Sequence, residues 1–349
     1  MIDVVILGAS GYGGGELLRL LCQHPQVRSI AALSRQYAGK PIHAAHPHLR
    51  GLVPLSFVSE YDWTDLRNSD SPVVFAAMPH GEFARQYASL EEAWAEAGLL
   101  DRLAVIDLSG DFRLKEAAAF EAAYGFAHPC PQALEQFTYG LSEWNGAAIA
   151  ASKRIANPGC FATAIQLGLL PLKALDLACP SWVAISAITG SSGSGASASE
   201  TTHHPTRAQD FRAYKVLQHQ HESEIRCSLQ SHGAGIDFAL VPHSAPLVRG
   251  IFATLTFPSM ATTGEIRAAF DSAYREAFFV RLVETTPRIA AVAGSNFTDI
   301  AVGARNGNAT VLVALDNLLK GMAGQAVQNL NLMLGIDATT GLRAAAAFP

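Results

Sequence analysis

The segment Gly8-Ala9-Ser10-Gly11-Tyr12-Gly13-Gly14 decides the fold of the first part of this chain. It follows an apolar run, residues 3–7, typical of a strand buried on both faces, and it opens a helical pattern over residues 15–23. Glycines let the backbone turn sharply beside a pyrophosphate, and a helix start offers free N–H groups at its positive end. The spacing Gly8-x-x-Gly11-x-x-Gly14 is looser than G-x-G-x-x-G. A tight structural turn is the alternative, but the order strand, turn, helix favours nucleotide binding.

Further strand patterns indicate the rest of this sheet. A second strand, residues 29–33, ends at Ser34-Arg35, where NAD-specific folds usually carry an acidic residue. An arginine fork suits a phosphate, so the pair favours NADP over NAD, with a solvated surface arginine as the alternative. Strand patterns at 73–78 and 103–108 flank a helical stretch at 82–97. This alternation predicts an α/β fold with a parallel, doubly wound sheet.

The composition limits the possible classes of protein. The chain has 349 residues, which predicts two domains. Apolar residues make up 49% and charged residues 16%, which excludes a disordered chain. With 25 Lys and Arg against 30 Asp and Glu, the net charge is −5, and no basic run occurs. The composition therefore argues against a nucleic-acid partner.

The sequence also indicates where the protein is located and whether its cysteines form disulfides. The apolar runs fall short of the ~20 residues that a membrane span needs, and the start lacks the basic region of a signal peptide. We therefore expect a cytoplasmic protein without a membrane partner. Five cysteines without CxxC spacing argue against a disulfide framework or a zinc site.

The pattern changes after about residue 152. Stretches 182–188 and 250–257 predict strands that flank a long serine- and histidine-rich segment, which indicates an α+β second domain. Within it, residues 190–199 fit a mobile active-site loop. A final helical stretch, 317–334, is apolar enough to pack on something large.

One cysteine has the setting of a nucleophile. Asn157-Pro158-Gly159-Cys160 is a turn, and residues 161–170 form a helical run, so Cys160 lies near a helix start whose dipole favours the thiolate. The other cysteines are interpreted as a loop residue, Cys130, and as small buried hydrophobic residues: Cys22, Cys179 and Cys227.

A histidine and a carboxylate offer a partner for this thiol. If a helix opens near His219-Gln220-His221, then His221 and Glu224 share one of its faces, and the carboxylate can orient the imidazole. A polar surface or a metal site is the alternative, but the adjacent pair His203-His204 is poorly spaced for one metal, and we expect none. Arg113 and Arg249 suit either an acidic substrate or structural ion pairs.

More segments complete an ordered pattern that covers nearly the whole chain. They are Tyr37-Ala38-Gly39-Lys40-Pro41, His46-Pro47-His48-Leu49-Arg50-Gly51, Pro79-His80-Gly81, residues 107–114, Tyr214-Lys215-Val216, Arg249-Gly250-Ile251, Gly294-Ser295-Asn296-Phe297 and the run from Ala314 to Gly321. With the glycine turn, the cysteine turn and His219-x-His221-x-x-Glu224, this pattern resembles the N-acetyl-γ-glutamyl-phosphate reductase family, relatives of aspartate-semialdehyde dehydrogenase.

The resemblance implies a fold and an activity. The fold is a Rossmann-type NADP domain, 1–152 plus 317–349, with an α+β catalytic and oligomerisation domain, 153–316. The activity is NADPH-dependent reductive dephosphorylation of a small acyl phosphate to a semialdehyde, in arginine biosynthesis, through a cysteine thioester. The subunits are expected to form a homodimer or homotetramer.

The resemblance also implies roles for particular residues. Cys160 is the nucleophile, His221 the acid and base, and Glu224 its partner. The residues expected to bind the cofactor are Gly8, Ser10, Gly11, Tyr12, Gly14, Ser34, Arg35, Pro79 and Asn317. Those expected to bind substrate are Arg113, Arg249 and Asn157.

One segment departs from the family pattern and leaves the substrate open. The family segment S-G-x-S-G-A-G-R is here Thr189-Gly190-Ser191-Ser192-Gly193-Ser194-Gly195-Ala196, followed by Thr202-His203-His204-Pro205-Thr206-Arg207. The His-His-Pro stretch is similar to sister enzymes that reduce aminoadipyl or glutamyl phosphate on a small acidic carrier protein. The form of the cysteine turn favours the arginine enzyme. An NADPH sensor without chemistry is a further alternative, but it leaves Cys160 and His221 unexplained.

Overall fold

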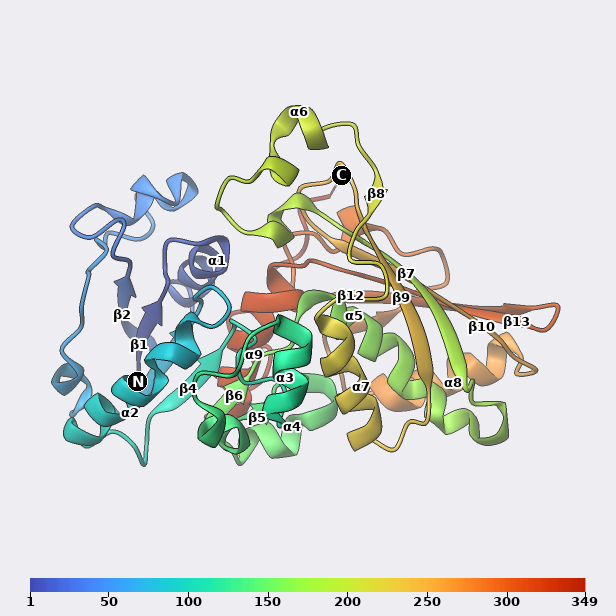
Figure 1. Ribbon diagram of the computed structural model, residues 1–349, viewed down its shortest axis with the longest axis horizontal. Coiled ribbons are helices and arrows are strands. Elements are labelled where there is room, and N and C mark those ends of the chain that lie inside the picture. Colours follow the sequence, from blue (N-terminus) through green and yellow to red (C-terminus); the bar gives the residue numbers. More distant parts are fainter. Residues whose placement is uncertain (349) are drawn as a thin grey trace. The chain divides into compact units, whose positions relative to one another are not determined.

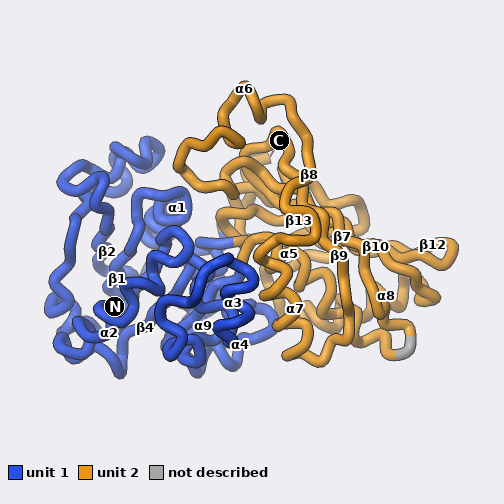
Figure 2. The backbone as a smooth tube through the Cα atoms, viewed as in Figure 1, with its two compact units in different colours: residues 1–158, 322–343 blue, residues 159–321, 344–349 orange. Residues whose placement is uncertain are grey.

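The computed structural model describes residues 1–348, apart from the side chain of Leu177. The chain forms two compact units, residues 1–158 with 322–343 and residues 159–321 with 344–349 (Figure 2). No helix among the described residues is both long and apolar enough to cross a bilayer.

The first unit is built on a six-stranded parallel sheet in the order β2-β1-β3-β4-β6-β5 (Figure 1). Its strands are β1 (Ile2–Leu7), β2 (Val27–Leu33), β3 (Ser71–Ala76), β4 (Ala104–Asp107), β5 (Thr138–Tyr139) and β6 (Arg154–Ala156). Every residue of β1 and β4 is buried, and each strand is apolar apart from one aspartate, Asp3 in β1 and Asp107 in β4. The predicted doubly wound α/β sheet is confirmed.

Five α-helices complete this unit: α1 (Tyr12–Leu21), α2 (Glu82–Glu96), α3 (Ala117–Tyr124), α4 (Ser142–Ala150) and α9 (Gly324–Met333). One core cluster under α2 contains fully buried aromatic rings, among which Phe112 and Phe137 stack with centroids 4.1 Å apart. Helix α9 comes from the end of the chain and packs against α1, α4 and β4. The helical stretch expected at 317–334 is a π-helical turn, Leu319–Ala323, followed by α9.

The second unit is built on a seven-stranded mixed sheet in the order β11-β12-β13-β10-β7-β9-β8. Its strands are β7 (Trp182–Thr189), β8 (Arg212–Ala213), β9 (Asp237–Ser244), β10 (Ile251–Pro258), β11 (Val280–Leu282), β12 (Thr298–Arg305) and β13 (Asn308–Leu315). Its α-helices are α5 (Cys160–Leu169), α6 (His204–Arg207), α7 (His221–Ser231) and α8 (Thr263–Tyr274). The predicted α+β second domain is thus also observed.

The two faces of this mixed sheet differ. Helix α5 packs on β10 and β13, and α8 packs on β12. A Cβ atom on Gly168 of α5 would meet Leu255 and Val313, both fully buried, so the helices cover the face that carries these side chains. Residues of alternate parity on β7, β9 and β10 stay partly exposed. Helices therefore bury one face of the sheet more completely than the other.

Two cysteine predictions are wrong. Cys22 and Cys227 are exposed rather than buried, Cys179 is half-buried, and Cys130 is buried. Cys22 follows the last turn of α1, and Cys227 lies on α7 next to the exposed Arg226. A lone cysteine in a sequence does not show which side of a helix it occupies, and these two lie on the solvent side.

Candidate active site

Helix α5 begins at Cys160, as the turn before it predicts. Gly159 is the residue that precedes the helix, with extended φ and ψ of −71° and 157°. Every later residue of α5 is buried, whereas Cys160 is half-buried. No residue of the first turn of α5 is acidic, and the positive end of the helix dipole lies beside the sulfur. The position favours a thiolate that is supported by the fold and still accessible.

Two glycines clear the space around Cys160. A Cβ atom on Gly159 would lie 2.4 Å from Nε2 of His221 and 2.7 Å from Oε1 of Glu224. A Cβ atom on Gly321 would lie 2.7 Å from the Cβ of Cys160. Neither position has room for a side chain, because real Cβ atoms do not approach other atoms this closely. The absence of these two side chains brings the imidazole and the carboxylate against the backbone beside Cys160.

Helix α7 supplies that imidazole and carboxylate. It starts at His221, which confirms the predicted helix, and both His221 and Glu224 are buried. Glu224 Oε2 accepts a hydrogen bond from the backbone N–H of Gly159 at 3.2 Å. Its other oxygen, Oε1, lies 3.8 Å from Nε2 of His221. The structure therefore brings together the three residues expected to carry the chemistry, Cys160, His221 and Glu224.

A layer of aromatic side chains lies behind His221. The backbone N–H of His221 donates to Nδ1 of His219 at 3.2 Å, and the two rings meet edge to face with centroids 4.5 Å apart. Burial lowers the pKa of His219 to about 4, and the charge of Lys215 acts in the same direction. His219 is therefore a neutral acceptor that holds the start of α7 in place. Its ring also contacts Tyr214, with centroids 5.9 Å apart.

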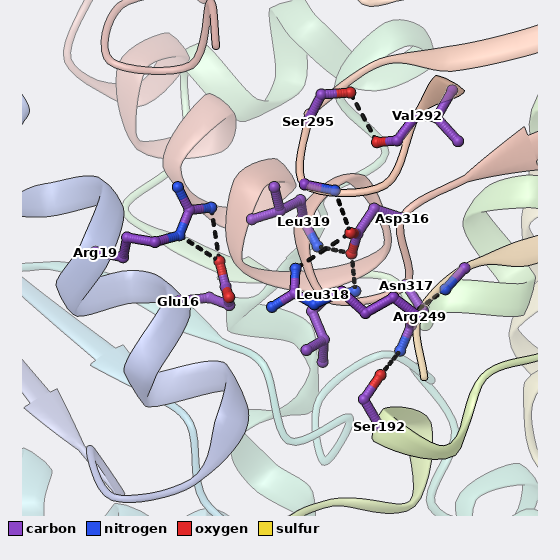
Figure 3. A network of polar contacts seen from close by, with 12 residues as sticks. Glu16, Arg19, Ser192, Arg249, Val292, Ser295, Asp316, Asn317, Leu318 and Leu319 are labelled. Atoms are coloured by element: carbon purple, nitrogen blue, oxygen red, sulfur yellow. Dashed lines mark hydrogen bonds and ion pairs between the residues drawn. The ribbon is translucent and has the colours of Figure 1, made fainter. Parts of the chain in front are cut away.

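A second polar network surrounds Asp316 (Figure 3). Its buried carboxylate accepts backbone N–H groups from Gly294 at 2.7 Å and from Leu318 at 2.8 Å, and it pairs with Nη1 of Arg249 at 3.2 Å. Arg249 thus has an internal ion-pair partner. The network holds the turn that leads from β13 towards Gly321, and so supports the backbone next to Cys160.

Asn317 lies in the second unit and ties two of its loops together. Its Oδ1 accepts the N–H of Gly250 at 2.7 Å, and its Nδ2 donates to Oγ of Ser192 at 3.0 Å (Figure 3). The N–H of Ser192 also donates to the carbonyl of Val248 at 3.0 Å. The start of the loop expected to be mobile, residues 190–199, is therefore fastened by hydrogen bonds.

The glycine turn of the first unit has the geometry of a nucleotide cradle. Gly8 follows β1 with φ +77°, and Gly11 is the extended residue that precedes α1. A Cβ atom on Gly14 would lie 2.5 Å from the carbonyl oxygen of Ala9, so the helix packs closely on the turn. No acidic residue lies in the first turn of α1, and Tyr12 there is exposed. These features fit a dinucleotide pyrophosphate.

The other residues expected at the cofactor lie around this turn. Ser34 follows β2, and its hydroxyl donates to Oγ of Ser10 at 2.9 Å. Arg35 beside it is exposed. Pro79 starts the turn before α2, and Asp111 fixes that turn by accepting the N–H of Gly81 at 2.7 Å.

Arg113 and Asn157 belong to one network in the first unit. Arg113 Nε donates to the carbonyl of Asn157 at 2.8 Å. The Asn157 side chain donates to the carbonyl of Met322 at 3.1 Å and accepts from Asn329 at 3.1 Å. Asn157 is fully buried, and its contacts hold the backbone just before the cysteine turn.

Some residues of the site were not given a role from the sequence: His219, Tyr214, Asp316 and Gly321. His219 is two residues from His221, a spacing that does not share a helix face, but it precedes the helix and folds back on it. The role of Asp316 could have been suspected from its position, because its carboxylate directly follows the largely apolar strand β13. Among residues 1–348, no three His, Cys, Asp or Glu side chains gather as metal ligands.

Comparison with known proteins identifies the family. Residues 3–152 match the family model for the NAD-binding domain of semialdehyde dehydrogenases, and residues 160–317 match the model for their dimerisation domain. The chain belongs to the semialdehyde dehydrogenase family.

The sequence relatives define a narrower group within that family. An N-acetyl-gamma-glutamyl-phosphate reductase of Laribacter hongkongensis is 40% identical over the full length of both chains, and that of Methanosarcina acetivorans is also 40% identical over both full lengths. A putative LysW-L-2-aminoadipate/LysW-L-glutamate phosphate reductase of Pyrococcus horikoshii is 40% identical over 98% of each chain. The expected resemblance to the reductase family is confirmed.

Solved structures share the fold. Aspartate semialdehyde dehydrogenase II of Vibrio cholerae superposes with a TM-score of 0.67 at 18% identity, over 95% of this chain and 98% of that one. The enzyme of Candida albicans, solved with NADP, gives 0.66 at 12% identity over 95% and 98%.

Proposed function

We propose that this protein reduces N-acetyl-L-glutamyl 5-phosphate to N-acetyl-L-glutamate 5-semialdehyde with NADPH, in arginine biosynthesis. The observation that carries the proposal is the position of Cys160 as the first residue of α5. Beside it, the Glu224 carboxylate accepts the N–H of Gly159 with one oxygen and lies near the imidazole of His221 with the other. Relatives 40% identical over their full length are named for this reaction.

The chemistry follows from the residues around the sulfur. The Cys160 thiolate attacks the acyl carbon, a C–S bond forms, the C–O bond to phosphorus breaks, and phosphate leaves. Backbone N–H groups at the start of α5 stabilise the oxyanion of this step. NADPH, when bound, supplies a hydride to the carbonyl carbon of the thioester. The C–S bond then breaks, the aldehyde is released, and His221 gives its proton to the departing sulfur.

The glycine turn supports the cofactor assignment, because no acidic residue in the first turn of α1 neutralises the positive end of the helix dipole there. Gly8, Ser10, Gly11, Tyr12 and Gly14 would hold the pyrophosphate. Ser34 and Arg35 would hold the 2′-phosphate, because a serine and an exposed guanidinium stand where NAD enzymes carry a carboxylate. Pro79 and Asn317 would line the path towards the nicotinamide.

Substrate anions require cations or N–H donors. Arg113, Arg249 and Asn157 are the proposed contacts from the sequence pattern. Since the guanidinium groups of Arg113 and Arg249 each keep an internal partner, they would bind an anion only with their remaining N–H groups.

We also propose a homodimer formed through the less covered face of the second-unit sheet. A row on this face is formed by four register partners on neighbouring strands, the half-exposed Leu312, Thr254 and Val241 and the exposed Ser186. A second copy would bury the row as sheets bury each other's faces. The match of residues 160–317 to a dimerisation domain supports this arrangement.

The experiment runs the reaction in reverse, with the semialdehyde, phosphate and NADP, and follows NADPH formation. Wild-type protein is expected to turn over, and Cys160→Ser to lose activity by a factor of about 10³ or more. Near wild-type activity of Cys160→Ser would exclude the thioester route. Cys22→Ser, at an exposed cysteine outside the site, is the matched control and is expected to keep wild-type activity.

The second candidate substrate is aminoadipyl or glutamyl phosphate on an acidic carrier protein. It is favoured by the exposed His203-His204-Pro205 stretch at α6 and by the relative from Pyrococcus horikoshii. A side-by-side assay on free N-acetylglutamyl phosphate and on the carrier-bound phosphate decides between the two. Faster reduction of the carrier-bound substrate would replace the first proposal.

A further inference from the structure

Two atoms of the Arg207 guanidinium, Nε and Nη2, lack a hydrogen-bond partner among residues 1–348. Arg207 is the last residue of α6, in the segment between β7 and β8. Its Nε and Nη2 atoms are enclosed by the protein, and neither has a hydrogen-bond partner among the described residues. Enclosed polar atoms in folded proteins are nearly always paired, so an enclosed pair of charged donors is a feature that needs an explanation.

These two atoms form one edge of the guanidinium. Nε–H and Nη2–H point in the same direction and match the two oxygens of a carboxylate or of a phosphoryl group. The same edge binds a carboxylate elsewhere in this chain. Arg28 donates from Nε and Nη2 to Asp3 at 3.0 and 2.5 Å, and Arg19 donates from the same atoms to Glu16 at 2.8 and 2.7 Å. At Arg207 this edge has no such partner.

The charges around Arg207 do not compensate it. Burial lowers its pKa, Tyr214 acts in the opposite direction, and the repulsion by Arg212 adds to the lowering. The nearby Tyr214 has a pKa raised by burial, so its phenol is neutral at ordinary pH and provides no counter-charge. Two enclosed, charged N–H donors without an acceptor are costly, and an oxyanion bound to them would remove that cost.

Arg207 is connected to the candidate active site through Tyr214. The phenol of Tyr214 feels the charges of both Cys160 and Arg207, and its ring contacts His219, which holds the start of α7. Tyr214 therefore links the segment that carries Arg207 with the surroundings of the reactive sulfur, where an anionic substrate would bind.

We propose that Arg207 recognises an oxyanion of the substrate, its carboxylate or its phosphoryl group, through the Nε and Nη2 edge, and so determines substrate specificity. The inference rests on the proposed function. To Arg113 and Arg249, both of which have internal partners, it adds a guanidinium edge that has no hydrogen-bond partner among the described residues.

The reverse reaction separates the two oxyanions, because the semialdehyde carries the carboxylate and phosphate is added independently. In Arg207→Gln, the KM for one of these two substrates is expected to rise about 10–100-fold, with kcat changed far less. A higher KM for the semialdehyde assigns the carboxylate, and a higher KM for phosphate assigns the phosphoryl group. Arg207→Lys keeps the positive charge but loses the paired N–H donors of the guanidinium, so its KM for that substrate is expected to lie between the values of wild-type protein and Arg207→Gln. Unchanged KM values for both substrates overturn the inference.

The matched control is Arg212→Gln, which removes an exposed, ion-paired arginine from the same segment and is expected to leave both KM values unchanged. Thermal unfolding without substrate tests a merely structural role. Arg207→Gln is expected to unfold at the wild-type temperature or above it, because it removes an unpaired cation. A lower unfolding temperature together with unchanged KM values assigns a structural role and overturns the inference.

The activity of wild-type protein distinguishes a failure of the proposed function from a failure of the inference about Arg207. If wild-type protein does not turn over the semialdehyde, the proposed function fails, and Arg207 is then tested by binding alone. Inorganic phosphate or N-acetyl-L-glutamate is expected to raise the unfolding temperature of wild-type protein but not of Arg207→Gln. Equal shifts, or no shift in either protein, overturn the inference.

Discussion

The carboxylate of Glu224 accepts a hydrogen bond at 3.2 Å from the backbone N–H of Gly159, the residue directly before Cys160. One side chain of α7 thus holds the start of α5, while its second oxygen faces the imidazole of His221 at 3.8 Å. The positions of thiol, imidazole and carboxylate are coupled through this contact. A shift of either helix would separate all three groups, which makes Glu224 a positioning residue.

Glu224→Gln is expected to lower kcat about 10–100-fold with little change in substrate KM. The amide keeps an oxygen for the Gly159 N–H, but it removes the negative charge that favours protonated His221. The dependence of kcat on pH is therefore expected to change as well. Glu222→Gln, which neutralises the same charge in the same helical turn, is the control. An unchanged pH profile in Glu224→Gln would contradict this role.

His219 is expected to make stability depend on pH. Its pKa is about 4 in the folded protein and about 6.5 in the unfolded chain, so between these values the unfolded chain binds more protons. The free energy of unfolding therefore rises with pH across this window and falls again as the pH is lowered through it. The contribution of His219 to this change is at most about 3 kcal/mol.

The measurement compares denaturant unfolding of wild-type protein and His219→Gln between pH 4 and pH 7, a range about as wide as this window. The variant is expected to lose part of the slope. Burial lowers the pKa of His24, His46 and His128 too, so some slope remains. His203→Gln, at an exposed histidine, is expected to behave like wild type. Equal slopes in wild type and His219→Gln would refute the prediction.

Gly11→Ala is expected to weaken NADPH binding about tenfold or more without unfolding the protein. Its φ and ψ of −77° and 171° suit any residue, and a Cβ atom there would meet only the Gly8 carbonyl oxygen, at 3.8 Å. Gly14→Ala is the contrasting variant, because its Cβ would lie 2.5 Å from the Ala9 carbonyl and disrupt the fold. Fluorescence titration with NADPH and thermal unfolding distinguish the two effects. Wild-type affinity in Gly11→Ala would place the pyrophosphate elsewhere.

Arg35→Ala is expected to raise the KM for NADPH about 10–100-fold and to leave the KM for NADH unchanged, because only NADPH carries the 2′-phosphate. Arg50→Ala, at another exposed arginine of the same unit, is the control. Equal changes with both coenzymes would argue against a 2′-phosphate contact at Arg35.

Thr254→Arg is expected to dissociate the proposed dimer, because it puts a charge within the row of Leu312, Thr254, Ser186 and Val241 on the sheet. Light scattering measures the mass of the particle. Thr256→Arg, at an already exposed position of the same strand, is the milder comparison. A dimer that persists in Thr254→Arg would place the interface on another surface.

Local patterns in the sequence were enough for much of the fold and the core of the site. The fully buried strands β1 and β4 are apolar in all but one residue each, and a turn followed by a helical run indicated the start of α5 at Cys160. The spacing of His221 and Glu224 indicated a shared helix face. Strands β12 and β13 were not predicted, since their half-exposed residues dilute the apolar pattern.

The sequence by itself determined a parallel α/β domain with a glycine turn and an α+β domain. It also determined that Cys160 lies at a helix start and that His221 and Glu224 share a helix face, because these features depend on local spacing. Only the tertiary structure decided which side chains meet. It gave Arg249 a carboxylate partner in Asp316, left Cys22 and Cys227 exposed, and enclosed the edge of Arg207 without a counter-ion. The physical reason is that pairing and burial depend on residues distant in the chain, whose approach no local pattern encodes.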